Sequence, residues 1–218
     1  VAAKVFPPHS KEVAIQKKSV LTHNYRSHKG ILEVAAQLVK KMVCFFPIGV
    51  DKAEDKGIAF GPRPMIVIGR EGAKQALANQ RLVVLIRDDD DNVVGDDGVI
   101  TPSPLREHLE KEDKAEGRTH NIFGIREFKG LEETHIAIYG FFGSIMDSKC
   151  LKGWKDVLEH DSKHPTQIIP MQMEFELKLL YTAVTRCRAK LMFIEPELEF
   201  DGKVSKAVEV FARWINDH

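Results

Sequence analysis

The sequence lacks several features that would place it in a common class of protein. It has no Gly-Lys-Ser/Thr step, so it cannot form the P-loop that holds a nucleotide's phosphates with a lysine and a hydroxyl at a helix start. No apolar run approaches the roughly 18 residues of a membrane-spanning helix. The N-terminus has no signal-peptide core. We therefore expect no membrane partner and no complete nucleotide site.

Cysteine is scarce as well. The three cysteines, Cys44, Cys150 and Cys187, are far apart, odd in number and never form a Cys-x-x-Cys pair. This usage predicts reduced thiols in an intracellular compartment, either the nucleus or the cytoplasm. The chain also lacks an initiator methionine, since it begins at Val1, and we expect a piece of a longer protein.

The composition is that of an ordinary globular protein. The 218 residues suffice for one domain, with 43% hydrophobic and 29% charged residues. The net charge is zero, but residues 1–41 hold eight Lys/Arg and two acidic residues (net +6), whereas residues 88–116 hold eleven acidic residues and three Lys/Arg (net −8). This asymmetry fits a groove for a polyanion at one end, and it fits solvated faces equally well.

Hydrophobic spacing predicts alternating strands and helices. Strands are expected at 18–22, 65–68, 82–86, 121–125, 135–142 and 190–195. Helices are expected from 29 to a stop at 46–49, near 72–79, and at 154–160, 173–188 and 205–216. The continuous apolar runs suit a parallel sheet covered on both faces, so we predict a doubly wound α/β domain.

Three polar segments occur in order along the chain: Asn24–Ser27, Lys129–Glu132 and Tyr181–Arg186. Because ligands of open α/β sheets bind at the carboxyl ends of strands, we expect all three segments near such ends or on the helix that faces them.

The side chains of these segments suit a nucleoside triphosphate. Arg26 and Arg186 carry permanently charged, bidentate donors for a transferring phosphoryl group. Tyr25 offers a flat face for a base, and Glu132 offers an acceptor for ribose hydroxyls. The alternative interpretation is two ordinary surface arginines and a tyrosine ring in the core at the end of a strand.

In type and order the segments resemble those of UvrD/Rep-type superfamily 1 helicases, in the C-terminal, second RecA-like motor domain. The family's Asn-Tyr-Arg-Ser segment supplies an adenine-stacking ring and a γ-phosphate arginine, matching Tyr25 and Arg26. Its Lys-Gly-Leu-Glu segment supplies a ribose-binding acid, matching Glu132, with Gly130 also expected at the nucleotide. Arg186 resembles the arginine finger. The resemblance covers about residues 18–195 and is nearest to the UvrD-like helicase region of TPR-and-ankyrin-repeat-containing proteins.

This resemblance implies a RecA-like, P-loop NTPase-type fold without its own P-loop, spanning residues 1–218. Residues 1–17 would be an incoming linker and residues 196–218 a C-terminal helix. ATP with Mg²⁺ would bind between this domain and the N-terminal RecA-like domain of the same longer protein, which would carry the Mg²⁺ ligands. Arg26 and Arg186 would be the catalytic residues. Single-stranded nucleic acid would be a second partner, contacted by His28, Lys29, Arg126, Phe128 and Lys129.

We therefore expect the second half of an ATP-dependent DNA or RNA helicase or translocase, inactive as an isolated chain. The alternative is a degenerate motor half that serves as a scaffold or interaction module in a larger repeat protein. Two departures favour this alternative: Phe128 replaces a small or hydroxylated residue, and Glu133 replaces an aromatic one. Residues 88–120 would form an acidic insertion in place of the family's large 2B subdomain, which puts strand separation in doubt.

No metal site is expected. The run Asp88–Asp91 lacks the glycine and glutamate spacing of an EF-hand, and Arg87 separates it from the preceding strand, where a magnesium-binding aspartate would stand. His160 and His164 have the spacing of a helical metal site but lack further ligands. Cys187 lies between two arginines, which would lower its thiol pKa, yet no base accompanies it, so a packing role is preferred.

Overall fold

The computed structural model describes residues 23–24, 26–48, 56–57, 59–78, 81–87, 93–94, 100–101, 104–145, 147–160, 169–196 and 202–217. At its centre is a five-stranded sheet in which every strand is parallel to its neighbours, in the order β3-β9-β8-β4-β7. The strands are β3 Met65–Ile68, β4 Val83–Ile86, β7 Asn121–Gly124, β8 Glu133–Tyr139 and β9 Cys187–Glu195. Two short pairs accompany it, β1 (His23–Asn24) with β2 (Lys56–Gly57) and β5 (Val93–Val94) with β6 (Ile100–Thr101).

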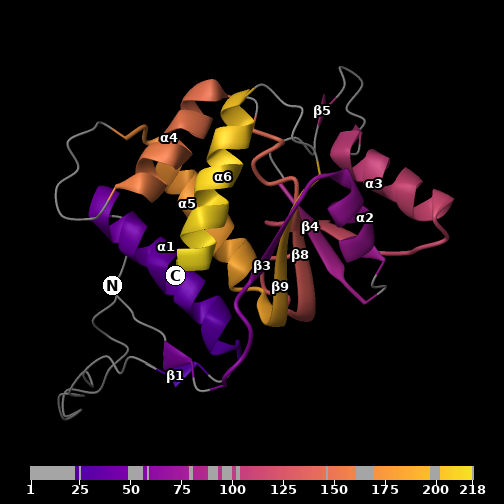
Figure 1. The fold of residues 1–218 in the computed structure, drawn as a ribbon, viewed down its shortest axis with the longest axis horizontal. Helices are drawn as coiled ribbons and strands as arrows, with labels where there is room; N and C mark the ends of the chain where they lie inside the picture. The colour runs from indigo at the N-terminus through magenta and orange to yellow at the C-terminus, as the bar shows by residue number, and fades with distance from the viewer. Residues whose placement is uncertain are drawn as a thin grey trace, which may run out of the picture.

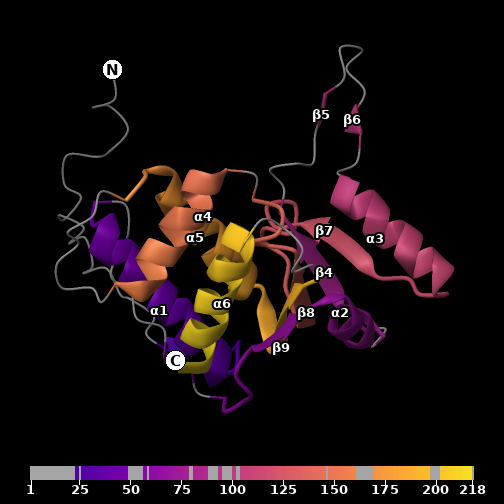
Figure 2. The same ribbon diagram turned by 45° about the horizontal axis from the view of Figure 1, so that its top comes forward.

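Helices cover both faces of this sheet, as Figure 1 shows. One layer contains α1 (Lys29–Phe45), α4 (Ser148–Glu159), α5 (Gln172–Val184) and α6 (Gly202–Asp217). The opposite layer contains α2 (Arg70–Leu77) and α3 (Pro104–Ala115). Figure 2 shows the β5 and β6 pair beyond the start of α3, away from the main sheet. No helix in the described part of the chain is both long and apolar enough to cross a membrane.

Strand residues alternate between the two layers, as the two-residue period of a strand requires. In β4, Val83 and Leu85 join the larger hydrophobic cluster under α1, α4, α5 and α6, whereas Val84 and Ile86 join the smaller cluster under α2 and α3. All four side chains are buried, which explains why this strand is a continuous apolar run in the sequence.

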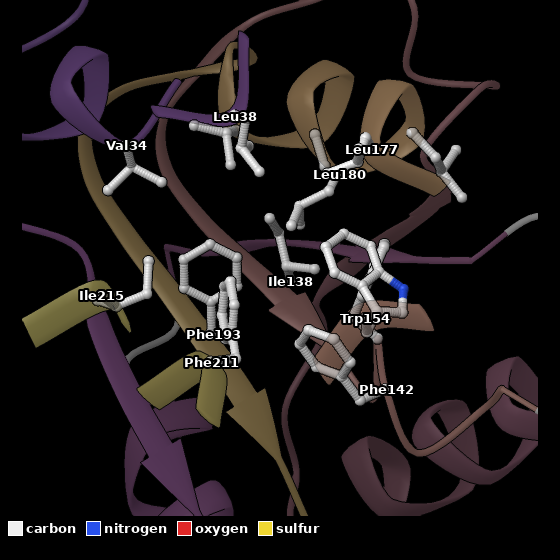
Figure 3. Packing of buried hydrophobic residues seen from close by; sticks show 14 of the residues in the cluster. Val34, Leu38, Ile138, Phe142, Trp154, Leu177, Leu180, Phe193, Phe211 and Ile215 are labelled. Carbon is white, nitrogen blue, oxygen red and sulfur yellow. The ribbon is translucent and has the colours of Figure 1, made fainter. Parts of the chain in front are cut away.

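Aromatic rings join the larger cluster across elements that are distant in sequence, as Figure 3 shows. The ring of Phe142, just after β8, lies 5.3 Å from Trp154 of α4 and 4.9 Å from Phe211 of α6, and Phe211 lies 4.9 Å from Phe193 of β9. Such pairs contribute about 0.5–1.5 kcal/mol each beyond their buried area. These contacts fix α4 and α6 on the carboxyl half of the sheet.

The predicted α/β class, the parallel sheet and the helices on both faces are confirmed. The expected strand at 18–22 and the expected linker at 1–17 lie outside the described residues. The helix expected at 154–160 begins earlier, at Ser148, because the carboxylate of Asp147 accepts a hydrogen bond from Lys149 N at 2.8 Å and caps the helix.

Two further boundaries differ from the sequence prediction. The helix expected to reach 188 ends at Val184, and β9 begins at Cys187, because the chain turns there and pairs with Glu133. Val184 and Cys187 are both buried, and a spacing of three suits a helix as well as a turn into a strand. The helix α3 was not predicted; its Leu109 is buried in the smaller cluster, so this part of the acidic region packs on the sheet.

The connection between β7 and β8, residues 125–132, is a crossover without a helix. Strand β4 lies between these two strands, and the register places Gly124 beside Ile86 and Ile138 beside Leu85. The chain therefore returns from the carboxyl end of β7 to the amino end of β8, a distance of about six strand residues or ~20 Å. It does so through turns on the face of the larger cluster, to which Phe128 belongs.

Candidate functional site

The three polar segments of the sequence meet at one edge of the sheet. The Lys129–Glu132 segment ends directly before β8 and the Tyr181–Arg186 segment ends directly before β9, its hydrogen-bonded neighbour. The first segment reaches the same place from outside the sheet, because Ser27 Oγ donates to the carbonyl of Cys187 at 2.8 Å. The starts of α1, β8 and β9 therefore border one surface, at the lower side of the sheet in Figure 1.

Two guanidinium groups and one carboxylate converge on this surface. Arg26 Nη1 lies 2.8 Å from Glu132 Oε1, with the Arg26 side chain 56% exposed and the Glu132 side chain 26% exposed. Arg186 Nη1 donates to the carbonyl of Leu131 at 3.4 Å, beside Glu132. The backbone joins the same loops, since Glu133 N donates to the carbonyl of Arg186 at 3.1 Å.

The Arg26–Glu132 ion pair is weak enough to be opened by a ligand. An ion pair with this exposure contributes about 0.2–1 kcal/mol, because water screens both charges. A phosphate could therefore replace Glu132 as the partner of Arg26 at small cost, while the carboxylate turned to hydroxyl donors. The cluster thus combines what a phosphate needs, bidentate cations, with what a sugar needs, a charged acceptor.

The expectation of a place at the carboxyl ends of strands holds for the first segment, which follows β1, and was wrong for the other two. Both Glu132 and Arg186 immediately precede a strand, so they stand at the amino edge of a sheet in which all neighbours are parallel. The physical reason is the crossover 125–132, which carries the chain back along the sheet before β8 begins, and helix α5, which does the same before β9.

Two other expected nucleotide residues have different outcomes. Tyr25 lies outside the described residues. Gly130 has a φ of 93°, in the left-handed region that glycine adopts without strain, and its turn brings the chain to Leu131 and Glu132. Gly130 therefore permits the turn before β8. Its contact with a nucleotide stays a prediction.

The residues predicted to contact nucleic acid divide into separate groups. His28 and Lys29 lie at the start of α1, where Lys29 N donates to the carbonyl of Ala59 at 2.8 Å. Arg126 lies in the crossover, with its guanidinium 4.5 Å from the centre of the Phe175 ring. Lys129 is exposed in the same crossover.

Phe128 was expected to offer a ring to nucleic acid, and the structure contradicts this. Its side chain is only 4% exposed, because the ring fills the space under the crossover, 5.2 Å from the ring of Phe123. A large apolar residue at this position anchors the crossover to the core, so it cannot stack on a base without unpacking the loop. Phe128, which departs from the family pattern, is thus a packing residue.

A buried charged network at the opposite, carboxyl edge was not predicted. Arg87 follows β4 and forms two hydrogen bonds of 2.6 Å with the carboxylate of Glu176 in α5. Glu176 also accepts from Trp154 Nε1 at 3.3 Å. Glu195, at the end of β9, accepts from the backbone N–H groups of Phe142 and Gly143, at 2.9 and 3.1 Å. Burial raises the pKa of Glu195 to about 7, although these two donors and nearby Arg87 lower it.

Signals for this network exist in the sequence. Glu176 lies on the inward stripe of α5 with Met173, Leu177, Leu180 and Val184, and a carboxylate at such a position requires a buried partner. Arg87 directly follows the apolar strand β4, a position at which a charged side chain can reach a buried partner.

Cys187 has the surroundings of a packing residue. Burial raises the pKa of Cys187 to about 11, and its thiol lies 3.7 Å from the carbonyl of Thr134, as a packing residue would. The run Asp88–Asp91 and His164 lie outside the described residues. Among the residues that the structure describes, no group of three or more His, Cys, Asp or Glu side chains could hold a metal ion.

Comparisons with known proteins show remote similarity both in sequence and in structure. The chain is 26% identical over 243 aligned positions to the human TPR and ankyrin repeat-containing protein 1; the match covers 93% of this chain and 8% of that protein's length. No protein-family model matches the chain. In structure it is similar to the C-terminal domain of a possible DNA helicase from Lactobacillus plantarum WCFS1, with a TM-score of 0.44, 14% identity, and coverage of 84% of this chain and 94% of that one.

Proposed function

We propose that this chain is the second motor domain of an ATP-dependent DNA or RNA helicase or translocase of the UvrD type. The observation that carries the proposal is the convergence of Arg26, Glu132 and Arg186, which lie 106 and 54 residues apart in sequence, on one partly exposed surface. These three charged groups are partly exposed, so packing of the hydrophobic core does not explain why they lie together.

In this proposal ATP binds between the surface and the first RecA-like domain of a longer protein. Arg186, and Arg26 once it leaves Glu132, stabilise the charge on the γ-phosphate, while Glu132 accepts hydrogen bonds from ribose hydroxyls. Tyr25 holds the base, and Gly130 lets the loop approach the nucleotide. Bound Mg²⁺, with ligands from the first domain, supplies charge neutralisation between the phosphates. The protein is then intracellular, in the nucleus or cytoplasm.

The test uses the full-length protein, assayed for ATP hydrolysis with and without single-stranded DNA or RNA. We expect Arg186→Ala to lower the stimulated rate at least about 10³-fold, as removal of an arginine finger does, with Arg186→Lys nearly as inactive because lysine lacks the bidentate fork. Arg213→Ala, an exposed arginine on α6, serves as the matched control and should keep the wild-type rate.

A second candidate function is a motor-like scaffold that does not respond to nucleotide. The burial of Phe128 favours it, because the segment that borders the strand track in the resembled family is anchored here to the core. This candidate predicts that Arg186→Ala leaves every activity of the full-length protein unchanged. That outcome, or a wild-type protein without nucleic-acid-stimulated ATP hydrolysis, would reject the motor proposal in its favour.

A further inference from the structure

A cation and an aromatic ring are stacked on the exposed side of α5. The guanidinium of Arg126 lies 4.5 Å from the centre of the Phe175 ring, and Phe175 is 46% exposed. Met171, one turn earlier in the chain, is 81% exposed. An isolated exposed phenylalanine needs no explanation, but a ring that holds a guanidinium over its face has a defined orientation and a defined charge beside it.

The helix pattern shows why Phe175 faces outward. Phe175 is not among the buried residues of α5, which are Met173, Glu176, Leu177, Leu179, Leu180, Ala183 and Val184. The Phe175 ring therefore contributes little to the hydrophobic core. Nearly half of the residue is in contact with solvent, so the ring forms part of the protein surface.

The two elements that carry this pair also carry the proposed nucleotide residues. The crossover carries Arg126 near its start and ends at Glu132, which pairs with Arg26. Helix α5 carries Phe175 and leads to Arg186, eleven residues later, or about 16 Å along a helix. The crossover thus has Arg126 at one end and Glu132 at the other, and α5 has Phe175 near its start and Arg186 just after its end.

The charges around the pair favour an anionic partner. The neighbouring acids are neutralised, Glu127 by Arg106 at 3.5 Å and Glu174 by Lys178 at 2.6 Å. Arg126 itself lies over the ring, and Lys129 follows in the same crossover, with its side chain exposed. A surface with an oriented ring beside a guanidinium and an exposed lysine has the chemistry that single-stranded nucleic acid recognises, because bases stack on the ring and phosphates bind cations.

We propose that Phe175, stacked with Arg126, is a base-stacking platform for single-stranded nucleic acid, with Lys129 contacting the phosphate backbone. This inference rests on the proposed motor function. It assigns to Phe175 the aromatic contact that was expected of Phe128. A base lies on the exposed part of the Phe175 ring, and Arg126 binds the adjoining phosphate.

The test measures binding of fluorescein-labelled oligo(dT) and oligo(rU) to the full-length protein by fluorescence anisotropy. We expect Phe175→Ala to weaken binding about 5- to 100-fold, since stacking of one base is worth that much, and Phe175→Trp to bind at least as tightly as the wild type. Phe175→Leu, which keeps an apolar side chain without a ring, should bind as weakly as Phe175→Ala. Arg126→Gln should lower the slope of log affinity against log salt by about 0.7, the loss of one phosphate contact.

A matched control is Ile48→Ala, which removes a fully exposed apolar side chain beyond the end of α1 and should bind like the wild type. Wild-type affinity of Phe175→Ala, with Arg186→Ala still inactive, would overturn the platform alone and leave the motor proposal standing. Wild-type affinity of Phe175→Leu would also overturn it, because an apolar side chain without a ring would then bind the strand as well as phenylalanine does. A wild-type protein that binds neither oligonucleotide would overturn both proposals.

Discussion

The buried ion pair between Arg87 and Glu176 ties α5, the helix that leads to Arg186, to the end of β4. The two side chains are 6% and 1% exposed, and both hydrogen bonds between them measure 2.6 Å. We predict that Arg87→Met lowers the free energy of unfolding by about 3–5 kcal/mol, because it leaves the Glu176 carboxylate buried without its cation. For a chain of this size the melting temperature should fall by roughly 6–20 °C.

The structure also predicts an asymmetry between the two partners. Glu176→Gln should cost less, about 1–3 kcal/mol, since the amide still bonds Arg87 and Trp154, and Arg87 keeps Glu195 nearby. Arg87→Met is worse because two buried carboxylates then share no cation. The double variant should therefore be more stable than Arg87→Met alone, as a neutral glutamine is cheaper to bury than an unpaired carboxylate.

The assay is urea unfolding of the chain followed by far-ultraviolet circular dichroism, with all variants at one pH. Lys178→Met is the control, since it breaks an exposed ion pair with Glu174 on the same helix and should cost less than about 1 kcal/mol. Two results would refute the reasoning: a loss below about 1 kcal/mol for Arg87→Met, or losses that simply add in the double variant.

Two further predictions concern single carboxylates. Burial raises the pKa of Glu195 from 4.5 to about 7, so the stability that this group contributes is complete below pH 4.5 and is lost as the pH rises through 7, about 3 kcal/mol in all. Glu195→Gln should remove this slope from unfolding curves recorded between pH 5 and 8, and an unchanged slope would contradict the assignment. In the full-length protein, Glu132→Ala should raise the KM for ATP about tenfold while the KM for 2′,3′-dideoxy-ATP stays nearly constant. An equal loss with both nucleotides would mean that Glu132 does not contact the ribose.

The strands and helices could be predicted where the hydrophobic period was long and unbroken. The run 82–86 and the stripe of α1 produced elements within one to three residues of those observed. The end of α5 was misjudged because apolar residues at 184 and 187 satisfy a helical spacing while the backbone turns between them. The start of α4 depended on a cap at Asp147, a local hydrogen bond that periodicity does not register.

The candidate site shows a different limit. The grouping of Arg26, Glu132 and Arg186 followed from chemistry and resemblance, but its edge of the sheet was assigned by a general rule for α/β folds. The sequence held the better evidence, since Glu132 and Arg186 each stood a few residues before a predicted strand, and a residue before a parallel strand lies at the amino edge. The burial of Phe128 was not predictable in this way, because it depends on a crossover whose path only the packing against Phe123 reveals.

The amino edge explains why arginines, and not backbone amides, would hold phosphates here. At the carboxyl edge of an α/β sheet, helices begin, and their free N–H groups bind anions, as in a P-loop. At this edge α5 ends, so its carbonyl groups face the site and attract the cation of Arg186, whose Nε donates to the carbonyl of Thr182 at 3.2 Å. Helix α1 does begin here, but the N–H groups of Lys29 and Ile31 are occupied by the carbonyls of Ala59 and His28.

A phosphate arriving at this surface therefore meets backbone acceptors, which repel it, and must rely on long cationic side chains. Guanidinium groups meet that requirement, because they span the distance from the backbone and keep their charge. In the proposed motor, we expect such a surface to bind a nucleotide poorly alone and well when the first domain presents the amide-rich half of the site. Under that proposal the absence of a P-loop and the presence of two arginines have one explanation, because each domain would supply the half of the site that its own sheet edge can build.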